Sequence, residues 1–486
     1  MEYQRGKKIH LQSCISVANL CILSSKTRIM RRLTLALIVL CASKGMAQNE
    51  ADPPPQILPM LMEIATATSP DRIETDIKAL VGFGTRHTLS DTTSETRGIG
   101  AARRWIKAEF ERISDDCDGC LEVSFQHSLV PAEGNRRIPE DTWVVNVLAV
   151  QRGTRYPNKF IIMSGDIDSR VSDPLNGESD SPGANDNATG MAGALEAARV
   201  LSQYEFPTSI IYVGLSGEEQ GLFGGKHMAA VAKEEGWDII GVLNNDMIGN
   251  IHGIDGVVDN TTFRVFSEPT PATADEQQRV WNRFYGGEVD GPSRQLARYV
   301  EKTTSTYMTN LRAIMIYRLD RFGRGGHHRP FNDEGFTGVR IMETHENYNH
   351  QHQDIRIEDG IEYGDVIEGV DFEYAAKLTA VNALTMASIA LAPPAPQGVM
   401  IGGAVRASTR LVWDPIEDPN LAGYKVYWRD TTAPQWQYSR WVGTDTDITL
   451  TNIIIDNYLF GVVSVSKEGA ESVVQFPGTL IPRGLR

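Results

Sequence analysis

Short, mainly apolar runs alternate with longer stretches of helical periodicity from about residue 60 to residue 392. A run that is apolar on both faces predicts a strand buried on both sides, and apolar residues recurring every three or four positions predict a helix. The expected strands are 160–163, 210–215, 239–243, 312–317 and 339–342. The expected helices are 188–201, 294–303 and 372–391. This order predicts an α/β domain in which helices cover both faces of a mainly parallel sheet.

The pattern changes after the proline-rich segment 393–396, where short alternating runs replace the helices. The runs 409–413, 423–428 and 458–463 predict an all-β sandwich, and we divide the chain into domains at 48–395 and 396–486. The second domain resembles a fibronectin type III module, through Leu411-x-Trp413 and the segment 421–428. Its aromatic residues are expected in the sandwich core rather than on a carbohydrate-binding face; they are Trp413, Tyr427, Trp428, Trp436 and Trp441.

The first residues predict a targeting segment rather than folded structure. Met30-Arg31-Arg32 is basic, the apolar run 33–41 is too short to span a bilayer, and Gly45-Met46-Ala47 offers small residues for cleavage. We therefore expect a signal peptide at 30–47, a doubtful upstream extension at 1–29, and a periplasmic or extracellular protein without a membrane anchor.

Charge and cysteine content narrow the function classes. Removing residues 1–47 removes eight basic side chains and one acidic side chain, so the remainder carries a net charge of −22 rather than −15. This acidity argues against nucleic acid and anionic membranes as partners. In an exported chain the pair Cys117 and Cys120 is best interpreted as a local disulfide, with a zinc half-site or a redox pair as alternatives.

Acidic residues recur just past the predicted strands or a Gly-rich turn. The stretches concerned are 165–169, 183–187, 216–220 and 245–249, followed later by His350 with Asp354 four residues on. The carboxyl ends of neighbouring parallel strands meet at one edge of a sheet, so these side chains are expected to converge. Carboxylates and an imidazole are ligands for divalent cations. The sequence therefore predicts a site for two metal ions.

These motifs resemble the co-catalytic zinc aminopeptidase family that includes the bacterial leucyl aminopeptidases. The resemblance runs from Gly84-Thr85-Arg86-His87 to the segment 350–354 and rests on five motifs in the family's order. It implies two divalent ions, expected to be zinc. The implied roles are Asp186 as the bridging ligand, Glu219 and His350 at one ion, Asp166 and Asp246 at the other, Glu218 as general base, Asp168 orienting the ligand at position 166, and Asp354 orienting His350.

One departure concerns the first ligand, because Asp166 stands where the family has a histidine. A site of three carboxylates should prefer zinc less and admit a harder cation. A two-metal enzyme, a one-metal enzyme and an inactive relative all remain open. His352 is the alternative to His350. His328 and Tyr348 are expected to line the substrate pocket, and Arg86 and His87 are interpreted as structural.

The sequence thus predicts an exported, metal-dependent aminopeptidase that acts on peptides. Two metals would polarise the scissile carbonyl and lower the pKa of a bridging water, and a free carboxylate would accept its proton. A binding protein that lost catalysis, with a sandwich that docks to a polymer or cell surface, is the alternative from another class. Glutaminyl cyclase or carboxypeptidase chemistry on the same fold is a further alternative.

Overall fold

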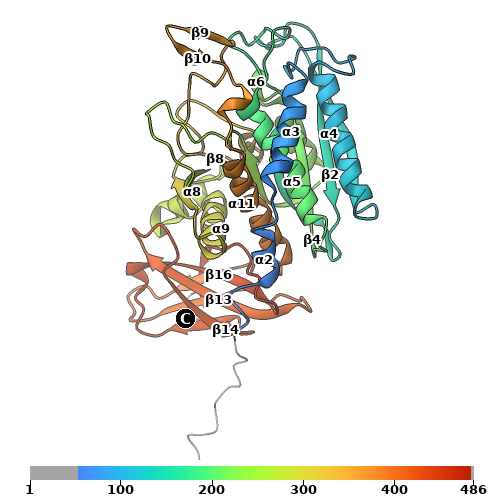
Figure 1. The fold of residues 1–486 in the computed structure, drawn as a ribbon. Coiled ribbons are helices and arrows are strands. Elements are labelled where there is room, and N and C mark those ends of the chain that lie inside the picture. The colour runs from blue at the N-terminus through green and yellow to red at the C-terminus, as the bar shows by residue number, and fades with distance from the viewer. Residues whose placement is uncertain (1–52, 483–486) are drawn as a thin grey trace, which may run out of the picture. The chain divides into compact units, whose positions relative to one another are not determined.

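An eight-stranded mixed sheet forms the centre of the first domain in the computed structural model, which describes residues 53–482 (Figure 1). Its strand order is β1-β2-β4-β3-β5-β8-β6-β7. The strands are β1 (Leu121–Val130), β2 (Thr142–Gln151), β3 (Tyr156–Asp166), β4 (Thr208–Leu215), β5 (Asp238–Asn245), β6 (Thr262–Ser267), β7 (Arg312–Ile316) and β8 (Gly338–Glu343). The predicted segments 1–29 and 30–47 lie outside the described residues.

The centre of this sheet is parallel, antiparallel pairs join it to strands on either side, and the outermost pair β6 and β7 is again parallel. Strands β4, β3, β5 and β8 run parallel to one another, whereas β1 pairs antiparallel with β2, β2 with β4, and β6 with β8. All five predicted strands are present. The prediction lacked β1, β2 and β6. At the sheet edge, β1 is largely exposed along its length, so it has no continuous apolar run.

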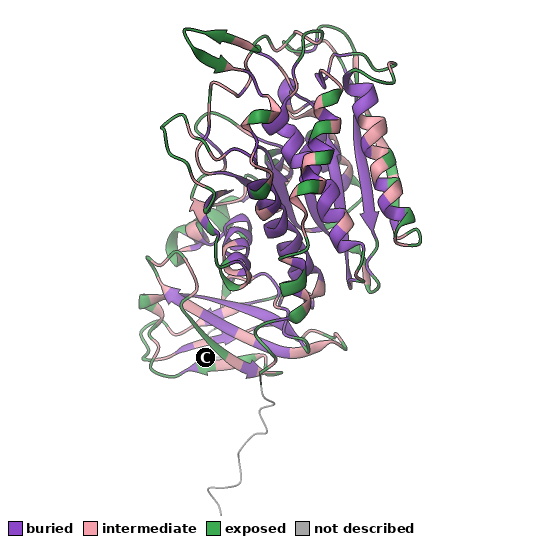
Figure 2. Cartoon of the chain, in the orientation of Figure 1, coloured by how far each residue is buried: buried purple, intermediate pink, exposed green. Residues whose placement is uncertain are grey.

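Helices cover both faces of the sheet, which confirms the predicted α/β architecture. They are α2 (Pro59–Ile64), α3 (Pro70–Gly82), α4 (Gly98–Asp115), α5 (Thr189–Leu201), α6 (Glu218–Gly221), α7 (Phe223–Glu234), α8 (Glu276–Tyr285), α9 (Pro292–Tyr307), α10 (His328–Asp333) and α11 (Phe372–Leu391). The larger core lies under α3, α4, α5, α9 and α11, and a second core lies under α7 and α10 (Figure 2). A small hairpin, β9 (Arg356–Glu358) with β10 (Ile361–Tyr363), projects from the loops after β8.

Helix α11 is long and apolar enough to cross a membrane, judged by length and composition alone. Nearly all of its side chains are buried, because α11 packs against α5, α9 and α3 and belongs to the larger core. A helix that is apolar on every side is expected at such a central place in a globular domain. Asp371 begins the helix by accepting a hydrogen bond from the backbone of Tyr374.

Seven short strands in two sheets make up the second domain, as the alternating pattern predicted. One sheet has the order β15-β12-β11-β17 and the other β14-β13-β16. The strands are β11 (Met400–Gly402), β12 (Thr409–Val412), β13 (Leu421–Asp430), β14 (Tyr438–Gly443), β15 (Asp447–Leu450), β16 (Tyr458–Ser466) and β17 (Thr479–Leu480). Trp413 and Tyr427 are buried, while Trp428, Trp436 and Trp441 are half-buried. The predicted division at residue 395 lies between α11 and β11.

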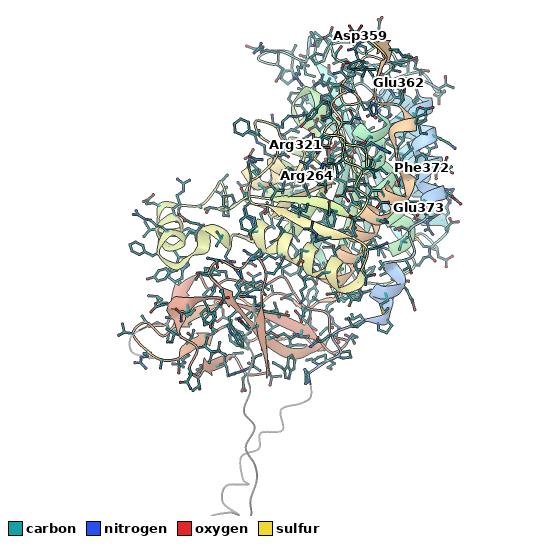
Figure 3. The ribbon with its side chains drawn as sticks, turned by 60° about the vertical axis from the view of Figure 1, so that its left-hand side comes forward. Arg264, Arg321, Asp359, Glu362, Phe372 and Glu373 are labelled. Carbon is teal, nitrogen blue, oxygen red and sulfur yellow. A yellow bond between two sulfur atoms is a disulfide. The ribbon has the colours of Figure 1, made fainter. Side chains whose placement is uncertain are left out.

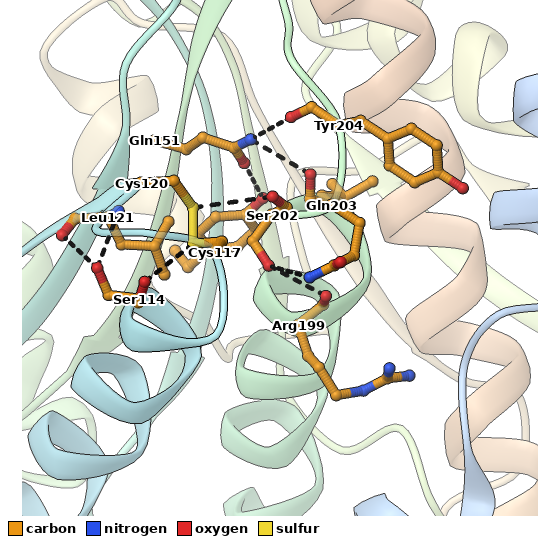
Figure 4. Close-up of a disulfide and its surroundings, with 11 residues drawn as sticks. Ser114, Cys117, Cys120, Leu121, Gln151, Arg199, Ser202, Gln203 and Tyr204 are labelled. Atoms are coloured by element: carbon orange, nitrogen blue, oxygen red, sulfur yellow. Dashed lines mark hydrogen bonds between the residues drawn. A yellow bond between two sulfur atoms is a disulfide. The ribbon is translucent and has the colours of Figure 1, made fainter.

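A disulfide joins Cys117 and Cys120 in the turn between α4 and β1, which confirms the local pairing expected from the sequence (Figure 4). Cys120 Sγ also lies 3.8 Å from the carbonyl of Ser202 at the end of α5. The hydroxyl of Ser114 donates to the carbonyl of Leu121, which ties the last turn of α4 to the first residue of β1. The disulfide closes a small loop far from the carboxyl ends of the central strands.

Candidate metal centre

Three parallel strands bring the candidate residues to one edge of the sheet. Asp166 is the last residue of β3; it pairs with Leu215 of β4, and its neighbour Gly165 pairs with Asn245 of β5. The residues that follow β4 and β5 therefore emerge level with Asp166. These are Glu218 and Glu219 at the start of α6, and Asp246. The predicted convergence at the strand ends is thus present.

One cluster has the geometry of a cation site. Asp186, Glu219 and His352 each present a ligand atom, and these atoms all lie within 4.8 Å of one another. His352 Nε2 is 3.0 Å from Asp186 Oδ2 and 2.9 Å from Glu219 Oε1. Burial lowers the pKa of His352, but Glu219 and Asp186 raise it overall to about 9. Two carboxylates facing one imidazole atom form a strongly negative cradle, which suits a divalent cation.

His352, and not the predicted His350, is the histidine at this cluster. His350 instead lines a small cavity beside Asp186 and Asn185 and follows a turn in which its N–H donates to Asn347. His352 has a positive φ of 55°, so the loop reverses direction there. The spacing argument for His350 assumed a regular segment, and this loop has none.

Asp354 does not take the predicted role of orienting a histidine. Its carboxylate is exposed and accepts a hydrogen bond from the Ser172 hydroxyl. Arg170 lies beside the histidine instead, with Nη2 2.7 Å from His352 Nδ1 and Nε donating to Glu219 Oε2 at 2.7 Å. Arg170 therefore links the imidazole and one carboxylate of the cluster.

Glu218 is half-buried near other carboxylates. Burial raises its pKa well above the ordinary glutamate value, and the negative charges of Glu219 and Asp246 raise it further. Gly217, with a φ of 71°, provides the left-handed turn that begins α6 directly after β4. A glutamate with a perturbed pKa beside a candidate cation site is a candidate for proton transfer.

Asp168 holds the backbone of both glutamates. Its Oδ1 accepts from the N–H of Glu218 at 3.1 Å, and its Oδ2 accepts from the N–H of Glu219 at 3.0 Å. The Thr88 hydroxyl also donates to it at 3.0 Å. The sequence predicted that Asp168 orients the residue at position 166. The structure corrects this: Asp168 positions the start of α6.

The remaining predicted ligands, Asp166 and Asp246, pair with protein cations or amides. Asp166 Oδ1 lies 2.5 Å from His327 Nδ1, and Oδ2 accepts from Asn187 Nδ2 at 2.7 Å. Asp246 Oδ2 lies 2.7 Å from Arg340 Nη2. Burial raises the pKa of Asp166 to about 8 and that of Asp246 to about 7. These two residues do not join the cluster formed with His352.

Two further predictions need correction or remain open. His328 was expected in the pocket, but it is fully buried, and its Nε2 lies 2.9 Å from the carbonyl of Leu319. Its neighbour His327 is the residue that faces Asp166. Tyr348 is 52% exposed, and its role in the pocket stays a prediction. Arg86 is structural, as predicted, because its guanidinium donates to the carbonyls of buried loops.

Arginines missed by the sequence reasoning surround the site. Arg321 and Arg264 both bind Glu346, at 2.9 Å each, and Arg321 Nη2 lies 3.9 Å from Asp246 (Figure 3). Arg340 lies within the predicted strand 339–342, where a charged side chain is unusual. That position was the signal in the sequence, although its partner could not be identified there.

The domain belongs to the α/β class. Helices cover a mixed sheet, and carboxylates gather where the parallel strands of that sheet end. Residues 146–361 match the model of peptidase family M28. The chain is 41% identical over 429 residues to a protein of Leptosphaeria maculans named "probable zinc metalloprotease", covering 88% of this chain and 98% of that protein. A second so named, from Pyrenophora tritici-repentis, is 37% identical, covering 86% and 97%. The chain belongs to peptidase family M28.

Solved structures resemble the chain more distantly. An aminopeptidase of Legionella pneumophila has 17% sequence identity and a TM-score of 0.49, covering 71% of this chain and 78% of that one. An aminopeptidase of an Aneurinibacillus strain has 14% identity and a TM-score of 0.46, covering 67% and 95%.

Proposed function

We propose that this protein is an exported, zinc-dependent aminopeptidase that hydrolyses peptides. The observation that carries the proposal is the cluster of Asp186, Glu219 and His352 with Glu218 next to it in the chain. The two fungal relatives named zinc metalloproteases support zinc as the metal. The predicted signal peptide at 30–47 supports export.

The ligand atoms of the cluster suit a divalent cation. Two carboxylate oxygens and one imidazole nitrogen are the donor set of several zinc enzymes, which keep further positions open for water and substrate. A cation bound there supplies Lewis acidity, which polarises the scissile carbonyl and makes water acidic enough to be deprotonated near neutral pH. Arg170 would hold Glu219 in place during this chemistry.

Glu218 is the proposed general base. Its carboxylate would take a proton from the attacking water and pass it to the nitrogen of the leaving amine when the peptide bond breaks. Asp168 contributes by fixing the Glu218 backbone, so the carboxylate begins from a defined position. The raised pKa suits a group that must hold the proton between these two steps.

Amino-terminal specificity is proposed from charge. A free peptide N-terminus is cationic and would be attracted to a pocket rich in carboxylates, whereas a C-terminal carboxylate would be repelled by them. The acidic residues of the site are buried or half-buried; they are Asp166, Asp168, Asp186, Glu218, Glu219 and Asp246. The partners are therefore proposed to be peptides with a free amino end. We assign no ligand to the sandwich beyond the proposal that it docks to a polymer or a cell surface.

Hydrolysis of aminoacyl-p-nitroanilides by the purified full chain tests this function. We expect activity that a chelator abolishes and zinc restores, and a loss of at least about 100-fold in kcat for Glu218→Ala, because general-base catalysis contributes this much or more. Glu362→Ala, in the exposed hairpin strand β10, is the matched control and should keep full activity. Undiminished activity in Glu218→Ala would contradict the proposal.

Assays on the same purified full chain distinguish the aminopeptidase from the alternative functions. Release of C-terminal residues from blocked peptides would indicate a carboxypeptidase, and cyclisation of N-terminal glutamine would indicate a glutaminyl cyclase. Zinc binding without turnover of any of these substrates would favour a binding protein.

A further inference from the structure

Both oxygens of Asp166 already have a buried partner. Its Oδ1 lies 2.5 Å from His327 Nδ1, and its Oδ2 accepts a hydrogen bond from Asn187 at 2.7 Å. Both partners are fully buried. A cation that replaced either partner would leave a buried polar group unpaired, which costs about 1–3 kcal/mol or more.

Asp246 is paired with the guanidinium of Arg340, which further contacts hold in place. Arg340 Nη2 lies 2.7 Å from Asp246 Oδ2, while Nη1 lies 3.1 Å from Asp320 Oδ2 and donates to the Gly325 carbonyl at 2.9 Å. The Arg340 side chain is fully buried on β8. Arginine is charged at every working pH, so it brings a permanent positive charge beside Asp246. That charge would repel a divalent cation at the same carboxylate.

The atoms that remain are too few for a second ion. Asp246 Oδ1 is buried without a hydrogen-bond partner in the described part of the chain, so this one oxygen is free. Together with Asp186 it would give two protein ligands, fewer than the three that catalytic zinc sites use. The cluster of Asp186, Glu219 and His352 offers three ligand atoms that lie within 4.8 Å of one another.

We infer that the chain binds one divalent cation, through Asp186, Glu219 and His352, and that Arg340 supplies the positive charge that a second cation would bring beside Asp246. The inference rests on the proposed function, because it takes the same three residues as the metal ligands. It assigns Asp246 and Asp166 to structural pairs, with Arg340 and His327 respectively, and not to metal binding.

Metal counting on the full chain tests this inference without depending on activity. The protein is stripped with a chelator and dialysed against excess free Zn²⁺, unbound metal is removed, and zinc per chain is measured by elemental analysis. We expect one zinc per chain. Titration of the stripped protein with Co²⁺ should likewise reach its spectral plateau at one equivalent.

Three conservative variants identify the residues that hold the ion. Asp246→Asn should keep one zinc per chain, with the zinc dissociation constant changed by less than about tenfold, the low end of the effect of outer partners. Asp320→Asn is the matched control, because it removes the other carboxylate of Arg340 and should behave in the same way. Glu219→Gln should raise the dissociation constant by about 100-fold or more, because it removes a direct ligand. Circular dichroism of each variant verifies that it is folded.

Failure of this inference is distinguishable from failure of the proposed function. Two zinc ions per wild-type chain, falling to one in Asp246→Asn, would overturn the inference and leave a two-metal peptidase. No zinc in the wild type, or one zinc held with unchanged affinity in Glu219→Gln, would overturn the proposed function and the inference together.

Discussion

Asp168 accepts the backbone N–H groups of both Glu218 and Glu219, one on each carboxylate oxygen. One buried side chain thereby fixes the proposed base and a proposed metal ligand at the first turn of α6. This arrangement suits two adjacent glutamates with different roles, because their backbone is held while Arg170 and His352 contact the carboxylate of Glu219.

Replacing Asp168 by Asn should therefore lower kcat more than zinc affinity. The amide offers one acceptor oxygen, and its NH2 group would face a backbone N–H. Losing a charged hydrogen bond costs about 1.5–3 kcal/mol, or roughly ten- to 100-fold in rate if it is expressed in the transition state. Thr88→Val, which removes the third hydrogen bond to Asp168, is the milder comparison. Equal kcat in Asp168→Asn and the wild type would contradict this positioning role.

Replacing His352 and replacing His350 should have opposite effects on zinc affinity. His352→Ala should lower zinc affinity by about 100-fold or more, because it removes one of three ligands. His350→Ala should keep the affinity within a few-fold, since His350 is not one of the three residues whose ligand atoms lie together. Competition with a fluorescent zinc chelator measures both constants. The reverse ranking would restore His350 as the ligand.

Much of this site could be predicted because its determinants are local. Strands β3, β4 and β5 are continuous apolar runs, and parallel strands place whatever follows them at one edge. The positions of Asp166, Glu218 and Asp246 followed from that rule. The assignment to one edge needed no knowledge of loop conformation.

The wrong predictions concern residues whose positions depend on long-range pairing or on the conformation of irregular loops. The choice between His350 and His352 depends on a reversal at His352, and no periodicity encodes it. The partners of Asp166 and Asp246 are His327 and Arg340, distant in sequence, which only the folded topology brings together. The buried charge of Arg340 within an apolar strand was visible, but its partner was not.

Glu471 should make stability depend on pH in acid. It accepts from Lys302 of α9 and Lys425 of β13, and lies 2.8 Å from the Tyr427 hydroxyl. Burial raises its pKa, but Lys302 and Lys425 lower it overall, from 4.5 to about 2. Because the folded pKa is below the unfolded one, this stabilisation is present above about pH 4.5 and is lost as the pH falls toward 2.

Thermal unfolding of Glu471→Gln between pH 7 and pH 2 tests that dependence. The variant should be less stable than the wild type at pH 7, by about 1–2 kcal/mol once the partial exposure of Lys302 is allowed for. The difference should shrink below pH 4.5. Glu417→Gln, an exposed glutamate of the same sandwich, should show no such trend. A difference that stays constant across this range would exclude the ion pairs as its origin.

Asp290 is expected to be a main stabilising contact between the α/β domain and the sandwich. Its carboxylate binds Arg298 of α9 at 2.8 Å and Arg429 of β13 at 2.7 Å, and all three side chains are buried. Asp290→Asn would leave two buried guanidinium groups facing each other without a counter-charge. Removing one partner from a buried ion pair costs about 3–5 kcal/mol.

Urea unfolding of Asp290→Asn, followed by tryptophan fluorescence, measures this cost. Arg155→Met is the matched control, because it removes a second charged contact with the sandwich, Arg155 with Asp418 at 2.7 Å, in which Arg155 is 38% exposed. The Arg155 end of this pair is open to solvent, and Asp418, whose side chain is 2% exposed, keeps a hydrogen bond from the Tyr156 hydroxyl, so losing Arg155 should cost less than losing Asp290. The Asp290 variant should therefore unfold at a clearly lower urea concentration than the Arg155 variant, and equal midpoints would refute the role of the buried cluster.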